Sequence, residues 1–184
     1  MKTVVIVAVI AAVIVVAAVC IQMQNQGKEK SSEGEYPDLV LKTSFDVNDQ
    51  HAYYDSVNNE YSTYTVTAKD PTNPDMYTVD QSGTSRSMSY NDIKQVIAPD
   101  LDYLSKGSKS FNKTGTTVIN TKAFGDLQCD QYRAVFGSDT EDYLYIDYCI
   151  TPSGVVIQLK GTIPKGSLVE YCLTLDSTTM VVAS

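Results

Sequence analysis

Side chains that could take part in catalysis or bind a metal ion are few in this chain. His51 is the only histidine among 184 residues, so every histidine-based triad or metal site would have to use it. Asp46, Asn48 and Gln50 resemble the start of a calcium-binding loop, but the sixth position is His51 instead of glycine and the twelfth is Val57 instead of glutamate. We therefore expect His51 to be a solvent-exposed residue of a loop.

Neighbouring carboxylates give no stronger signal. The pairs Asp100/Asp102 and Glu141/Asp142 fall in expected turns or helix starts, where acidic residues are common for structural reasons. The chain has no nucleophile elbow, phosphate-binding loop or zinc-protease motif. We predict that the protein has no catalytic residue, metal site or cofactor and is not an enzyme.

The cysteines are better placed for a disulfide than for chemistry. Two alternating runs, 128–136 and 142–150, flank a loop that contains glycine and predict a β-hairpin. If Phe136 pairs with Asp142, the apolar residues share one face and Cys129 lies opposite Cys149, within disulfide range. We expect a Cys129–Cys149 disulfide with Cys172 left over. A zinc site is disfavoured because the thiols lack close spacing and a nearby histidine.

The segments around this hairpin predict an antiparallel sheet. Residues 155–160 and 168–175 continue the alternation and complete a four-stranded meander with one apolar and one polar side. Asn91 is a suitable N-cap for a short helix that Pro99 would stop, and one more helical turn is expected around Leu101 and Leu104. The expected fold is mainly β (or α+β), a curved antiparallel sheet of about seven to ten strands with one or two short helices. Further strands are expected at 39–47, 60–67, 76–80, 84–90 and 116–122.

The N-terminal segment predicts a membrane anchor. Residues 3–21 are apolar throughout, without charge, proline or glycine, and as a helix they would span roughly 30 Å, the thickness of a bilayer core. The run is long for a secretory signal, and small residues at Ala17 and Ala18 are not followed by a polar mature start. A lipobox-like stretch ends at Cys20, but Val19 is branched where a small residue is required. We favour a retained transmembrane helix over a cleaved signal peptide or lipidation at Cys20.

The remaining chain is expected to be one extracytoplasmic domain. Residues 1–21 would be the anchor, 22–36 a flexible polar linker and 37–184 the β-domain. The Asn112-Lys113-Thr114 sequon, a candidate glycosylation site at Asn112, and the cysteines suit an outside location. The formal net charge of −8 lies in the domain, because the charges before residue 36 cancel. It disfavours nucleic acid as a partner.

These observations favour a membrane-anchored domain with a non-catalytic binding or scaffolding role. Its partner would be a protein or a hydrophobic small molecule, besides the membrane itself through residues 3–21. The alternative is a half-barrel carrier of a lipid or other hydrophobic ligand, by analogy with tethered half-barrels in general. An apolar cavity above about 300 Å³ would favour the carrier, and a filled core would exclude it. A pilin-like filament subunit is a third alternative, disfavoured because the apolar run lacks an acidic residue and a processing site.

Overall fold

The computed structural model of the protein describes residues 36–137, 144–163 and 168–184. The chain divides into two units, Met1–Glu35 and Tyr36–Ser184, and the fold is that of the second unit. The expected anchor, Cys20 and nearly all of the expected linker lie outside the described residues. Within the described ranges, no helix is long and apolar enough to cross a membrane.

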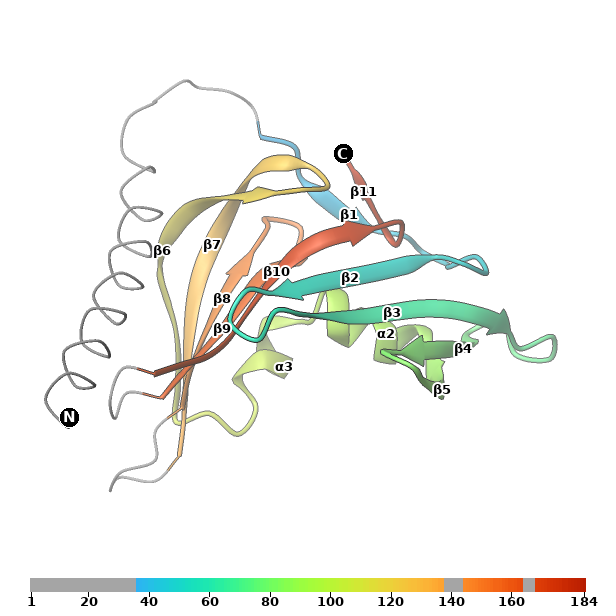
Figure 1. Ribbon diagram of the computed structural model, residues 1–184, viewed down its shortest axis with the longest axis horizontal. Helices are drawn as coiled ribbons and strands as arrows, with labels where there is room; N and C mark the ends of the chain where they lie inside the picture. The colour runs from blue at the N-terminus through green and yellow to red at the C-terminus, as the bar shows by residue number, and fades with distance from the viewer. Residues whose placement is uncertain (1–35, 138–143, 164–167) are drawn as a thin grey trace, which may run out of the picture. The chain divides into compact units, whose positions relative to one another are not determined.

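Nine strands of the described chain form one antiparallel sheet in the order β5-β4-β3-β2-β10-β9-β8-β7-β6 (Figure 1). The sheet consists of two meanders, β2 to β5 and β6 to β10, which join where β10 pairs with β2. The antiparallel sheet confirms the predicted mainly β class. The bounds are β2 Gln50–Asp55, β3 Glu60–Lys69, β4 Met76–Gln81, β5 Thr84–Ser89, β6 Ser110–Thr121, β7 Gly125–Phe136, β8 Leu144–Ile150, β9 Val156–Ile163 and β10 Leu168–Thr178.

The remaining elements are short. Strands β1 (Leu39–Leu41) and β11 (Val181–Ala183) pair with each other as a separate two-stranded sheet. Helices α2 (Tyr90–Ile97) and α3 (Leu101–Ser105) connect β5 to β6 and lie against one face of the large sheet (Figure 1). The two helices therefore lie between the two meanders in the sequence, and they cover one face of the sheet that the meanders form.

Helix α2 is fixed by its first residues and by its apolar stripe. The Ser89 hydroxyl accepts a hydrogen bond from the Asp92 backbone N–H at 3.1 Å, and the Asp92 carboxylate accepts one from the Ser89 N–H at 2.8 Å. The N-cap is thus Ser89, two residues before the predicted Asn91. Ile93 and Ile97, four residues apart, are buried on the sheet.

The sheet is bent by irregular pairing. Register shifts occur between β8 and β9, between β9 and β10, and between β10 and β2. Such bulges increase the local twist of a sheet. Strand β6 also comes close to β9 and β10, with which it does not pair. The sheet is therefore curved at this end.

Burial changes face along β7, which differs from the predicted meander with one apolar side. Leu127 and Cys129 belong to the larger core cluster, whereas Ala134 belongs to a second cluster with Tyr148 and Ile150. Positions 129 and 134 are an odd number apart, so their side chains lie on opposite faces of the strand. The two faces of β7 are therefore buried at opposite ends of the strand, each in a different core cluster.

Three segments differ from the predicted elements. Only Leu39–Leu41 of the expected strand 39–47 is a strand, and the chain then forms a loop up to Asp49. The segment around His51, expected to be a loop, is strand β2. Strand β6 begins at Ser110, six residues before the expected strand 116–122. Polar strand residues weakened the alternation in the latter two segments.

Candidate functional site

A cavity of about 200 Å³ lies between the large sheet and its helical cover. Its floor comes from strands β2, β3, β8, β9 and β10, and its roof comes from α2, α3 and Pro99 between them. Most of the lining surface is apolar. The lining residues are Tyr53, Ser62, Tyr64, Gln95, Val96, Pro99, Leu104, Tyr148, Val156, Leu159 and Leu173.

The strand register brings the floor residues together on one face of the sheet. Tyr148 on β8 pairs with Leu159 on β9, and Leu159 pairs with Leu173 on β10. Residues directly opposite on neighbouring strands lie on the same face of the sheet. Tyr53 on β2 likewise pairs with Ser62 on β3. The floor is therefore set by long-range pairing and not by any local motif.

Two of the three tyrosines of the floor, Tyr53 and Tyr148, are neutral phenols near neutral pH. The Tyr53 hydroxyl donates a hydrogen bond to the Val156 carbonyl oxygen at 3.0 Å, and burial raises the pKa of Tyr53. Burial, with a smaller contribution from Tyr171, raises the pKa of Tyr148 to about 12. No charged side chain lines the cavity within the part of the chain that the structure describes. The cavity thus suits an uncharged, largely apolar occupant.

A second, open groove of about 440 Å³ adjoins the cavity. Tyr64, Gln95 and Val96 line both spaces. The groove is more polar, and its Gln81 amide donates a hydrogen bond to the Tyr64 hydroxyl at 3.3 Å. Its full lining is Tyr64, Gln81, Arg86, Ser87, Met88, Asp92, Gln95, Val96 and Tyr103.

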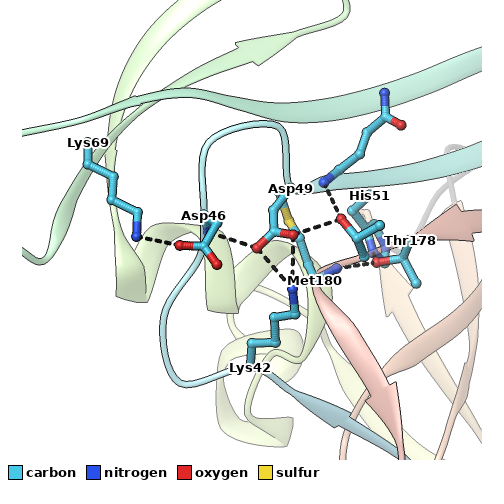
Figure 2. Close-up of polar contacts among 9 residues, drawn as sticks. Lys42, Asp46, Asp49, His51, Lys69, Thr178 and Met180 are labelled. Atoms are coloured by element: carbon cyan, nitrogen blue, oxygen red, sulfur yellow. Dashed lines mark hydrogen bonds and ion pairs between the residues drawn. The ribbon is translucent and has the colours of Figure 1, made fainter.

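A polar cluster around Asp49 has a structural role (Figure 2). The Asp49 carboxylate accepts hydrogen bonds from Lys42 Nζ at 2.9 Å, the Asp46 backbone N–H at 2.8 Å and the Thr179 hydroxyl at 2.9 Å. Burial raises the pKa of Asp49, but these hydrogen bonds outweigh burial, so its pKa lies below the ordinary value. The carboxylate ties the loop after β1 to the turn before β11.

His51 lies beside this cluster and is not the exposed loop residue that the sequence predicted. Its side chain is fully buried in β2, with Nδ1 3.0 Å from the Thr178 hydroxyl and the ring edge against Tyr53. Burial lowers the pKa of His51 to about 3. Nε2 has no hydrogen-bond partner among the described residues. The prediction was wrong because both faces of strand β2 are buried. His51 and Tyr53 are buried on one face, and Ala52 is buried on the other.

The three described cysteines are free thiols, and the predicted register was wrong by two residues. Phe136 pairs with Leu144 instead of Asp142, so Cys149 lies opposite Gln131 and not opposite Cys129. A shift of two keeps every side chain on its face, which is why hydrophobic alternation could not detect it. Burial raises the pKa of Cys129 to about 12 and that of Cys149 to about 11, so both are poor nucleophiles.

The other candidate residues do not converge on a site. The Asp100 carboxylate forms an ion pair with Lys94 Nζ at 3.0 Å, and Asp102 is exposed in α3. Glu141 and Asp142 lie outside the described residues. Asn112 is exposed on β6. In the described ranges, no group of three or more histidine, cysteine, aspartate or glutamate side chains could hold a metal ion.

Sequence reasoning did not find the cavity, because its lining comes from distant segments that no motif connects. The only local signal was the apolar alternation of β8, β9 and β10, which marks a buried face but not an empty space on it. Comparisons with protein-family models, curated proteins and solved structures give no match for this chain.

Proposed function

We propose that the described unit is a non-enzymatic binding domain that holds a small apolar group in the cavity beneath the curved sheet. The supporting observation is the cavity itself, which has apolar walls and no charged lining among the described residues. Its volume of about 200 Å³ exceeds the roughly 150 Å³ of an apolar cavity that binds benzene. A ring or a short alkyl chain is therefore the expected occupant.

The volume restricts the carrier alternative. Pockets for drug-sized ligands typically measure about 300–1,000 Å³, so a cavity of 200 Å³ is too small to enclose a whole lipid. We propose that only part of a larger ligand enters. We also propose that residues 3–21 tether the domain to a membrane on its extracytoplasmic side. The observation that supports this proposal is the uninterrupted apolar sequence of these residues.

Binding of toluene to the full chain tests this function. Toluene carries no polar group, so its binding reports on the cavity alone. We expect saturable shifts of methyl NMR signals from Leu104, Leu159 and Leu173, because these side chains line the cavity.

A matched pair of variants provides the control. Ser62→Phe places a ring in the cavity and should abolish toluene binding, since Ser62 lines it from β3. Thr63→Phe adds the same ring at the next position, which alternates to the opposite face, and should leave binding unchanged. Toluene that fails to bind the native chain, or that binds Ser62→Phe equally well, would contradict the proposal.

A further inference from the structure

The cavity and the groove form one trough across the sheet. From β8 to β5, the floor passes from Tyr148, Leu159 and Leu173 to Tyr64 and then to Gln81 and Arg86 on the groove side; Tyr64 lines both spaces. Register pairs Tyr64 with Gln81, which places both on one face of the sheet. Arg86 pairs with Val79, a core residue of that same face. The trough is therefore apolar at one end and polar at the other.

Gln95 stands where the two spaces meet. Its Oε1 is buried and has no hydrogen-bond partner among the described residues. A buried acceptor without a partner destabilises the conformation that buries it. The Gln95 side chain therefore loses no hydrogen bond at Oε1 when it rotates.

Among the described residues, two charged side chains line the groove, Arg86 and Asp92. The Asp92 carboxylate already accepts hydrogen bonds from the Ser89 N–H and the Ser89 hydroxyl, at 2.8 and 2.7 Å. It also lies in the first turn of α2, where the helix dipole favours a negative charge. The Arg86 side chain is exposed and, within the part of the chain that the structure describes, makes no hydrogen bond or ion pair.

We infer that the ligand is an amphiphile with a short alkyl or aryl tail in the cavity and an anionic head group held by Arg86 in the groove. This inference rests on the proposed function and adds the head group to it. A guanidinium pairs with a carboxylate or phosphate through parallel hydrogen bonds. The chain has a formal net charge of −8, so its overall field repels anions and a preference for them must come from a local cation.

Three probes of equal tail length test the inference on the full chain: octanoate, 1-octanol and octylammonium. Isothermal titration should give octanoate an affinity about fivefold above that of 1-octanol, the scale of an exposed ion pair. Arg86→Gln should remove this preference by lowering the affinity for octanoate toward that for 1-octanol. Lys122→Gln, which changes the net charge equally but alters a lysine paired with Asp176 outside the trough, should keep the preference.

Two results would overturn the inference while leaving the proposed function intact. In the first, toluene binds but octanoate binds no better than 1-octanol or octylammonium. In the second, octanoate is preferred but Arg86→Gln does not change the preference. If toluene also fails to bind, the proposed function itself is wrong.

Discussion

Single residues in this protein owe their properties to burial more than to their neighbours in sequence. His51 and Asp49 are two positions apart, and both are buried. The carboxylate has three kinds of donor around it and stays ionised, whereas the imidazole has one hydroxyl partner and stays neutral. The difference lies in the partners that the loop and β10 supply, because burial penalises the charged form of both groups.

We predict that the free energy of unfolding falls by about 2 kcal/mol between pH 7 and pH 5. The pKa of His51 is about 3 in the folded protein, below its ordinary value of 6.5 in an unfolded chain. The contribution of His51 to stability is therefore complete above pH 6.5 and is lost as the pH falls toward 3. Urea denaturation at the two pH values measures the difference.

The His51→Leu variant is the control for this prediction, because it cannot titrate. Its unfolding free energy should differ little between pH 7 and pH 5, whatever its absolute stability. A variant that keeps the native pH dependence would show that other groups cause it.

The pairing of neighbouring strands depends on close contacts between them as well as on the alternation of apolar and polar residues. Gly161 on β9 pairs with Tyr171 on β10 at a position where the register shifts. The tyrosine ring lies over the glycine, where a Cβ atom would be only 2.4 Å from the ring carbons. The absence of a side chain at position 161 therefore allows the aromatic residue to cover the strand.

We predict that Gly161→Ala lowers the free energy of unfolding by about 1–3 kcal/mol, because the methyl group displaces the Tyr171 ring. Gly115→Ala on β6 is the matched control, since its nearest neighbour, Gln131 Oε1, is at an ordinary 3.5 Å. Chemical denaturation of both variants provides the comparison. Adding Tyr171→Leu to Gly161→Ala should recover part of the loss, and equal stability of the two alanine variants would refute the steric explanation.

The whole molecule divides at residue 35. Both core clusters of the described residues belong to the second unit, Tyr36–Ser184. A unit that holds its own core can fold without the rest of the chain. The proposed tether and the proposed binding domain are therefore separable in experiment.

We predict that a chain lacking residues 2–35 keeps the thermal unfolding midpoint of the full chain and is no longer retained by membranes. Circular dichroism in matched detergent measures the midpoint, and extraction of membranes at alkaline pH measures retention. A full chain that is released by alkaline extraction would contradict the proposed tether. A truncated chain that does not unfold cooperatively would contradict the independence of the domain.

The sequence by itself determined the class of the fold and many of its elements. Alternation identified β7 to β10 as an antiparallel meander, and the position of Pro99 after an apolar stripe predicted the end of α2, because these signals are local. Alternation also assigned the paired side chains of β7 and β8 to their correct faces relative to each other.

Only the tertiary structure decided the rest. The register of β7 against β8, and with it the position of Cys149 relative to Cys129, depends on the length of the loop between the two strands. Hydrophobic alternation repeats every two residues and cannot determine that length, so the predicted pairing was two residues off. The burial of His51 and the cavity beneath the sheet depend on β10, α2 and α3, which lie far from β2 in the chain. Cavities and perturbed pKa values arise where distant elements meet, and a sequence pattern reports on one element at a time.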